Sequence, residues 1–207
     1  MIVCAGTVTD IDENVYQTVK IGNQVWTVEN LRVTHYNDGT PIPLVTDSLD
    51  WYILKKRKEP GYCWYDNDSA SNADPYGALY NWYTVETGKL APSGWHVPTN
   101  AEWITLEKYL INNGYNWDGT TTENKIGKSL SAKTNWTSWI IAGTIGNDLS
   151  LNNRSGFTAL PAGLRNYYSC TFVNQSKYAY WWSATEARTL TAYSCYLDYY
   201  YEALYSN

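Results

Sequence analysis

The sequence predicts an α+β domain in which short antiparallel strands and a few helices are joined by long loops. Three observations indicate this class: an N-terminal segment that alternates in hydropathy, a strongly capped amphipathic segment near the middle of the chain, and many short apolar runs between turn residues in the last third. The chain of 207 residues can bury one substantial core, and no Pro/Ser-rich linker divides it. We therefore expect residues 1–207 to form a single domain.

Residues 6–28 predict an N-terminal β-meander. Two runs typical of strands, Val15–Ile21 and Gln24–Val28, flank the dipeptide Gly22-Asn23. Glycine and asparagine tolerate the positive φ angles of a tight hairpin turn, so this dipeptide is a strong local hairpin signal. The polar residues Asp12–Asn14 predict a further turn before the first of these strands.

Residues 74–114 predict a pair of helices. The second helix starts at Thr99, because Glu102 follows at the spacing of a capping box, and Gly114 suits its C-terminal cap. Its apolar face repeats at intervals of three and four residues and consists of Trp103, Leu106, Leu110 and Tyr109. The first helix is expected from Asp74-Pro75, an N-cap followed by proline at N1, to Gly88.

The remaining segments give weaker signals. Residues 122–131 predict a third, shorter helix, and residues 29–46 are interpreted as mostly loop because they contain Asn37-Asp38-Gly39 and two prolines. The basic run Lys55–Lys58 is interpreted as a solvated loop, in preference to an anion-binding site. Residues 153–207 predict a Tyr/Trp-rich region of short strands and loops.

Charge and hydropathy exclude two classes of partner. The net charge of −5 and the pI near 5.0 provide no basic field for nucleic acid. No apolar run approaches the roughly 20 residues of a membrane-spanning helix. The N-terminal residues lack the charged region and apolar segment of a signal peptide, and a lipid-modified Cys4 is a minor alternative because Val3 is a poor residue before that cleavage.

The cysteines and acidic residues predict no metal site and no cofactor. Cys4, Cys63, Cys170 and Cys195 contain no CxxC pair, so zinc is disfavoured. Free thiols and a Cys170–Cys195 disulfide remain equal alternatives. Asp66–Asp68 offers oxygen atoms of the kind that Ca²⁺ prefers, but no EF-hand spacing follows, so a plain turn is favoured.

Several segments together resemble a known family. In order along the chain they are GTVTDIDENVYQTVKIGNQVWTVENLRVTHYNDGTPIP, GYCWYDND, YGALYNWYTV, LAPSGWHVPTNAEW, GFTALPAGLRN and YWWSATE. They resemble the Fibrobacter succinogenes major paralogous domain, from about Gly6 to the C-terminus. More distantly, GWHVPTNAEW is similar to a segment of the formylglycine-generating enzymes. The resemblance implies a C-type-lectin-like fold and an extracytoplasmic protein, at the cell surface or secreted, of Bacteroidota-type bacteria.

Three departures limit what the resemblance implies. Formylglycine-generating enzymes bind copper through a close pair of cysteines, whereas Cys170 and Cys195 lie far apart without that motif, so an oxidoreductase is disfavoured. The Glu-Pro-Asn, Gln-Pro-Asp and Trp-Asn-Asp triplets of calcium-dependent lectins do not occur. Family members usually continue into a further strand, which predicts an open sheet edge near Tyr205-Ser206-Asn207.

The C-terminal 42 residues carry the functional signal. They contain ten of the 20 tyrosines, with Ser and Asn between them and only Lys177 and Arg188 as strong cations. Such mixtures form adaptable binding surfaces, and they resemble the variable regions of diversity-generating-retroelement proteins. We expect about half of these tyrosines to pack between sheets. The candidates for an exposed ligand-binding surface are Tyr167, Tyr168, Tyr178, Tyr193, Tyr199, Tyr201 and Tyr205.

Catalysis has no support from the sequence. His35 and His96 are the only histidines, and neither belongs to a Ser-His-Asp or HExxH pattern. Among the carboxylates Glu29, Glu102 and Glu186, Glu102 already has a capping role. The sequence therefore predicts a non-enzymatic recognition domain that binds a protein or glycan ligand, without fixing an oligomeric state. The alternative is a structural domain of a larger envelope or adhesin assembly.

Overall fold

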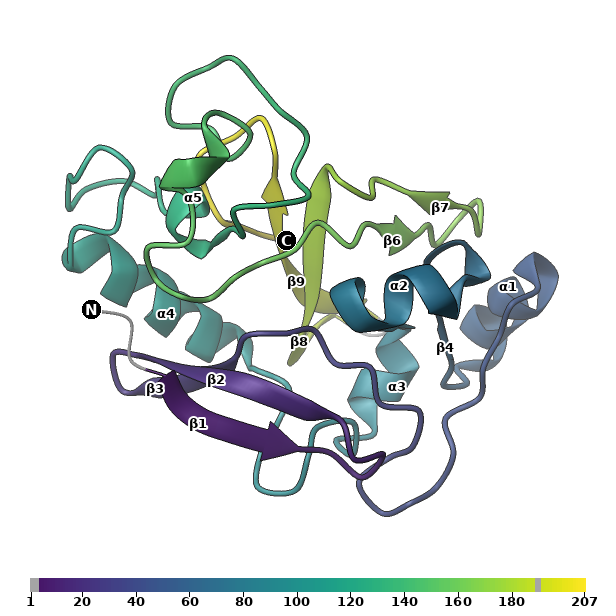
Figure 1. Ribbon diagram of the computed structural model, residues 1–207. Helices are drawn as coiled ribbons and strands as arrows, with labels where there is room; N and C mark the ends of the chain where they lie inside the picture. Colours follow the sequence, from purple (N-terminus) through teal and green to yellow (C-terminus); the bar gives the residue numbers. More distant parts are fainter. Residues whose placement is uncertain (1–3, 189–190) are drawn as a thin grey trace.

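Two three-stranded antiparallel sheets and one long helix form the centre of the molecule (Figure 1). The computed structural model describes residues 4–188 and 191–207. The strands of the N-terminal sheet are β1 (Cys4–Thr9), β2 (Val15–Ile21) and β3 (Gln24–Thr27). Those of the C-terminal sheet, in the order β10-β9-β8, are β10 (Tyr205–Ser206), β9 (Thr191–Asp198) and β8 (Tyr178–Arg188). The predicted α+β class is confirmed.

The predicted hairpin between β2 and β3 is confirmed. Ile21 pairs with Gln24 across the turn, and Gly22 has a φ of +62°. A Cβ atom at Gly22 would lie 2.8 Å from the ring of Tyr109. Glycine is therefore required both by the turn and by the close approach of the helix that carries Tyr109.

The helix α4 (Asn100–Asn112) packs against both sheets. Its capping box is present, because the Thr99 hydroxyl accepts from the Glu102 N–H and the Glu102 carboxylate accepts from the Thr99 N–H at 2.8 Å. Trp103, Leu106 and Leu110 are at most 3% exposed. They meet β2, β3, β8 and β9 in the main hydrophobic cluster. The predicted start is confirmed, and so is the apolar face for these three residues, whereas Tyr109 is 36% exposed and packs over Gly22.

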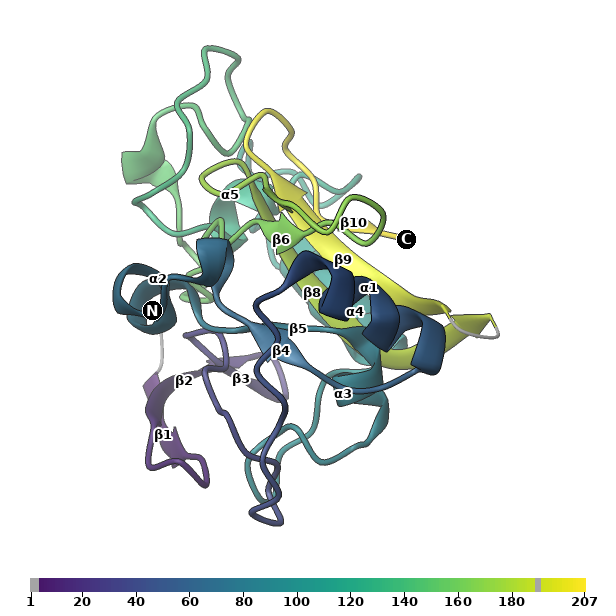
Figure 2. The same cartoon turned by 90° about the vertical axis from the view of Figure 1, so that its right-hand side faces the viewer.

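The predicted helix from Asp74 to Gly88 is wrong. The structure has instead α2 (Ser69–Tyr76), β5 (Leu79–Tyr80) and α3 (Trp82–Glu86), as Figure 2 shows. The true N-caps are Asp68 and Asn81, whose side chains accept from Ser71 N and Thr84 N. Gly77, with a φ of +73°, ends α2, and β5 pairs with β4 (Tyr62–Cys63). Two capping residues and one glycine thus divide the segment.

The basic run is not a loop. It forms the last turn of α1 (Ser48–Arg57), which Asp47 caps at its N-terminus and Lys58 ends with a φ of +58°. The sequence interpretation missed this helix because it has almost no apolar periodicity. Trp51 is its one buried residue.

The other elements are short. The predicted third helix is confined to α5 (Gly127–Leu130), because Glu123 adopts a φ of +61°. The 3₁₀ turns are η1 (Tyr65–Asn67) and η2 (Leu149–Leu151), and the β6–β7 hairpin pairs Leu164–Arg165 with Phe172–Val173. No helix in the described part of the chain is long and apolar enough to cross a membrane.

Three cysteines carry free, buried thiols. Cys63 and Cys170 belong to a small cluster with Trp51, whereas Cys195 belongs to the main cluster, so the Cys170–Cys195 disulfide is not formed. Burial raises the pKa of the Cys63 thiol to about 11 and that of Cys195 to about 12. Both groups stay protonated at neutral pH. The side chain of Cys4 lies outside the described part.

Candidate functional site

The C-terminal sheet presents tyrosines on one face and core residues on the other. The register places Tyr178 opposite Asp198 and Tyr180 opposite Tyr196, and Tyr205 of β10 pairs with Tyr196. At the alternate positions, Ala179, Cys195 and Leu197 are at most 1% exposed. Successive residues of a strand point to opposite sides. We call the rings of Tyr178, Tyr180, Tyr196 and Tyr205 the tyrosine face; Figure 2 shows β8, β9 and β10, the strands that carry it.

The rings of the tyrosine face are in mutual contact. The ring centroids of the stacked pair Tyr178 and Tyr180 are 5.5 Å apart, with an interplanar angle of 4°. Those of the stacked pair Tyr196 and Tyr205 are 5.1 Å apart, with an angle of 18°. The turn after β9 extends the row, because Tyr201 lies 5.5 Å from Tyr205. Each aromatic pair contributes about 0.5–1.5 kcal/mol beyond the area it buries. These contacts hold the rings in a fixed arrangement.

The carboxylate of Asp198 lies beneath these rings. The residue is 1% exposed although it points to the same side of the sheet as the tyrosines. It accepts from the backbone N–H of Tyr200 at 3.3 Å and from the hydroxyls of Tyr178 and Tyr200. Burial raises the pKa of Asp198 above its ordinary value, while these hydrogen bonds oppose the rise. Burial and the neighbours Tyr200 and Asp198 also raise the pKa of Tyr178.

An aromatic cleft of about 750 Å³ adjoins the tyrosine face. Its walls come from α1, α3, β8, the segment before α4 and the loop between β6 and β7. Tyr180 belongs to both the cleft and the tyrosine face, and Trp182 lines the cleft with 37% of its surface exposed. Trp182 donates from Nε1 to the Tyr80 carbonyl at 2.9 Å. Ligand clefts in proteins have this size and this mainly apolar lining.

A second tyrosine pair lies at the α1 end of the cleft. Tyr167 and Tyr168 are 52% and 82% exposed, and their rings lie edge to face at 5.0 Å. The ammonium of Lys55, on α1, lies 3.3 Å from the Tyr167 ring centroid and 4.8 Å from that of Tyr168. Cation–π contacts of this kind stabilise by about 0.5–1 kcal/mol at exposed sites. They place a positive charge beside two accessible aromatic faces.

The comparison with known families gives one match. The model of the Fibrobacter succinogenes major domain matches residues 19–206. The chain belongs to this family. The matched range includes the whole cleft and the tyrosine face. No curated protein and no solved structure matches the chain.

The structure separates the seven predicted tyrosines of this Fibrobacter succinogenes major domain into groups. Tyr167 and Tyr168 line the cleft, and Tyr178, Tyr201 and Tyr205 belong to the tyrosine face and the turn after β9. Tyr199, in the same turn, packs instead against the main hydrophobic cluster and Trp139. Tyr193 lies apart from both groups, because alternation along β9 places it on the side of Cys195.

The expectation that half of the C-terminal tyrosines pack between sheets is wrong. None of the ten is fully buried; Tyr201 is 45% exposed, and the others outside the 167–168 pair are half-buried. On the core side, β8 and β9 instead contribute Ala179, Trp181, Cys195 and Leu197.

The sequence interpretation missed other members of the site. They are Tyr180, Tyr196, Tyr200, Trp182 and Lys55. The alternation Tyr178-x-Tyr180-x-Trp182 could have indicated the first and the fourth, because residues two apart in a strand share a face. Nothing local in the sequence could have indicated that Lys55 belongs to the site, since Tyr167 and Tyr168 follow more than a hundred residues later.

Each of the two histidines lies within hydrogen-bond distance of one carboxylate. His96 Nε2 lies 2.8 Å from Glu102 Oε1, and the imidazole is exposed. His35 Nδ1 lies 2.6 Å from Asp12 Oδ1 and 3.2 Å from the Thr34 hydroxyl. A catalytic relay needs the two partners on different ring nitrogens, and here both share one. Among the described residues, no group of three or more His, Cys, Asp or Glu side chains could hold a metal ion.

Proposed function

We propose that this domain is a non-catalytic, extracytoplasmic recognition module that binds a protein or glycan ligand through its C-terminal aromatic surface. The observation that carries the proposal is the continuity of the tyrosine face with the aromatic cleft through Tyr180. Together they offer stacked rings, accessible rings and a cleft in one region.

The physical chemistry of the surface favours binding. Tyrosine provides broad contact with few rotatable bonds, and its hydroxyl adapts to either donors or acceptors. Ring stacking and the hydrogen bonds to Asp198 hold Tyr178 and Tyr200 in place before a ligand arrives. A preorganised surface loses less side-chain entropy on binding. We therefore assign the region to recognition, with Tyr201 and Tyr205 as candidate contacts at its far end.

The resemblance to C-type-lectin-like and diversified proteins supports the same proposal. In such proteins, a rigid scaffold carries changeable side chains at the surface. Here residues on the core side of β8 and β9 pack in the main hydrophobic cluster, whereas residues of the tyrosine face lie away from it. Exchange of these side chains would alter a ligand contact without emptying the core. A diversified ligand-binding protein is thus consistent with how the sheet divides its residues.

A binding array tests the proposal. The wild-type domain and the variant Tyr167→Ala/Tyr168→Ala/Tyr201→Ala are applied to immobilised glycans and proteins, with Tyr109→Ala on α4 as an exposed-tyrosine control. We expect a bound ligand whose affinity falls about tenfold or more in the triple variant and by less than about twofold in the control. Circular dichroism and thermal melting check that all three proteins fold. Absence of any ligand, or equal losses in both variants, would favour a structural domain of an envelope or adhesin assembly.

A further inference from the structure

The α1 end of the cleft is lined by two cations, and no carboxylate lines the cleft beside them. Lys55 and Arg165 both line the cleft there. The one carboxylate of the lining is Glu29, which lies at the β3 end and accepts from the Gln17 N–H at 2.8 Å. This positive end contrasts with the net charge of −5 of the whole chain.

Arg165 is a buried cation that lacks an acidic partner. It is 7% exposed, and its guanidinium donates to the backbone carbonyls of Cys170, Val45 and Thr46 at 2.7–3.0 Å. No described carboxylate lies within ion-pair distance of it. Asp47 is close enough for their charges to interact, but it caps α1 through Leu49 N and Asp50 N. The guanidinium carbon also lies 4.8 Å from the Trp51 ring centroid and 5.0 Å from that of Phe172. Because Arg165 forms no ion pair with a described carboxylate, these contacts and the charge of Asp47 offset its positive charge only in part.

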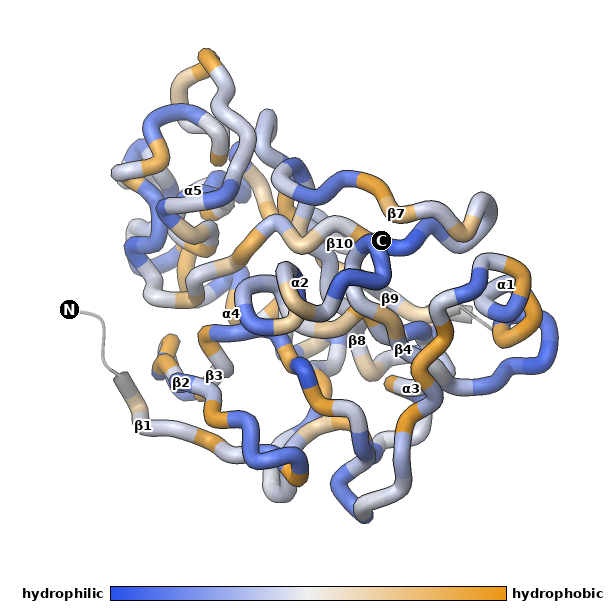
Figure 3. The backbone as a smooth tube through the Cα atoms, turned by 45° about the vertical axis from the view of Figure 1, so that its right-hand side comes forward, coloured by the Kyte–Doolittle hydropathy of each residue, from blue (hydrophilic) through white to orange (hydrophobic). Residues whose placement is uncertain are grey.

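Lys55 carries a second unpaired charge to the mouth of the cleft. It is followed by Lys56, Arg57 and Lys58, and none of these four cations makes an ion pair with a described residue. Cations in the last turn stabilise a helix C-terminus. That role explains the run, and Figure 3 shows α1 changing from hydrophobic to hydrophilic along its length. It does not require Lys55 to lie over the rings of Tyr167 and Tyr168.

We propose that this end of the cleft binds the acid group, carboxylate or sulfate, of an acidic glycan. Lys55 contacts the acid group, and Arg165 adds a fixed positive potential from below. Tyr167 and Tyr168 receive the face of the sugar ring, because sugar C–H groups carry partial positive charge and the aromatic face is negative. The inference rests on the proposed function and narrows its ligand to one chemical class.

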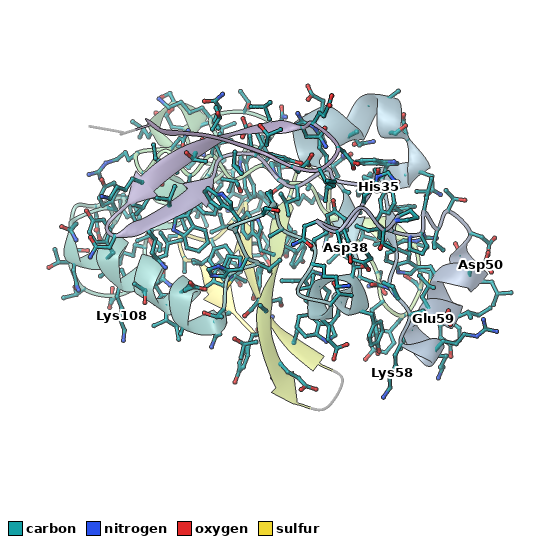
Figure 4. The ribbon with its side chains drawn as sticks, turned by 90° about the horizontal axis from the view of Figure 1, so that it is seen from below. His35, Asp38, Asp50, Lys58, Glu59 and Lys108 are labelled. Atoms are coloured by element: carbon teal, nitrogen blue, oxygen red, sulfur yellow. The ribbon has the colours of Figure 1, made fainter. Side chains whose placement is uncertain are left out.

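The experiment compares saccharides that differ only in charge. Oligogalacturonate, its fully methyl-esterified form and a sulfated galactan oligosaccharide are titrated calorimetrically into the full chain at low and high ionic strength. The variants are Lys55→Met, the charge-retaining Lys55→Arg, and Lys108→Met as a control. Figure 4 shows Lys108 on α4, at the opposite end of the molecule from Lys58 of the basic run. Polyglutamate is the competing probe for an acidic peptide ligand.

We expect the acidic saccharides to bind more tightly than the methyl ester, and high salt to reduce this preference. Lys55→Met should weaken acid binding about tenfold, because it removes a charge-assisted hydrogen bond to the acid group. Lys55→Arg should retain most of the affinity, and Lys108→Met should change it less than about twofold.

Four results would overturn the inference: equal affinity for acid and ester, equal effects of Lys55→Met and Lys108→Met, stronger binding of polyglutamate, or no binding of any saccharide. Each leaves the proposed function standing if the array yields a ligand that depends on the exposed tyrosines. If the array yields none, the proposed function fails as well.

Discussion

The molecule contains two aromatic assemblies that differ in origin and in exposure. The buried one joins Trp26 of β3, Trp103 of α4, Phe157 of a loop and Trp181 of β8, with ring centroids 4.9–6.1 Å apart. The half-exposed one, the tyrosine face, comes entirely from three neighbouring strands. The first assembly ties distant parts of the chain together, whereas the second is formed within one sheet and leaves its rings accessible.

Strand β8 separates the two assemblies. Trp181 contacts Trp103 and Phe157 in the main cluster, whereas the next residue, Trp182, lies 5.9 Å from Trp82 and is 37% exposed; both indoles line the cleft. Trp181 and Trp182 therefore point to opposite faces of the sheet. The difference shows that strand alternation, more than residue type, decides which of the two indoles packs against Trp103 and Phe157 and which is the more exposed.

Trp103→Ala should give the largest effect on stability. The ring is 3% exposed and contacts three other rings, so its removal leaves a large cavity. We expect a loss of about 3–5 kcal/mol in the free energy of unfolding, measured by urea denaturation. Trp103→Phe should cost clearly less, because it keeps a ring and removes an indole N–H that has no hydrogen-bond partner. Equal losses in the two variants would contradict an assembly held by packing.

Trp182→Ala should have a smaller effect on stability and a larger one on binding. The substitution removes the hydrogen bond to the Tyr80 carbonyl and the contact with Trp82, but the ring is already 37% exposed. We expect a loss of about 1–2 kcal/mol in the free energy of unfolding. At a temperature where the variant is fully folded, ligand affinity on the array should still fall. A stability loss as large as that of Trp103→Ala would contradict the view that the two faces of β8 contribute differently to the free energy of unfolding.

The sequence indicated the elements whose signals are local. The capping box of α4 and the Gly22-Asn23 hairpin each depend on residues within a few positions, and both are present. The division of residues 74–88 was missed because the competing caps Asp68 and Asn81 are as local as the signal that was chosen. The site was predicted only in part. Arg165 reaches its carbonyl partner Val45 across 120 residues, a relation that only the folded chain reveals.

Asp198→Asn should produce the smallest effect, a change in how stability depends on pH. Because the folded-state pKa of Asp198 is raised, the folded protein holds this proton more tightly than the unfolded chain does. Its contribution to stability is therefore complete below the ordinary carboxyl pKa and is lost as pH rises through the folded pKa. The asparagine carbonyl can still accept from Tyr178 and Tyr200, so the tyrosine face should persist.

The measurement is the difference in unfolding free energy between wild type and Asp198→Asn across the range from about pH 4 to about pH 7. The difference cancels the opposite slopes of other carboxyls, such as Asp12, whose pKa is lowered. We expect the variant to gain stability relative to wild type as pH rises, and Asp50→Asn, an exposed carboxylate of α1, to show a smaller trend. A difference that is independent of pH would mean that Asp198 is not the buried charge around which the tyrosine face is organised.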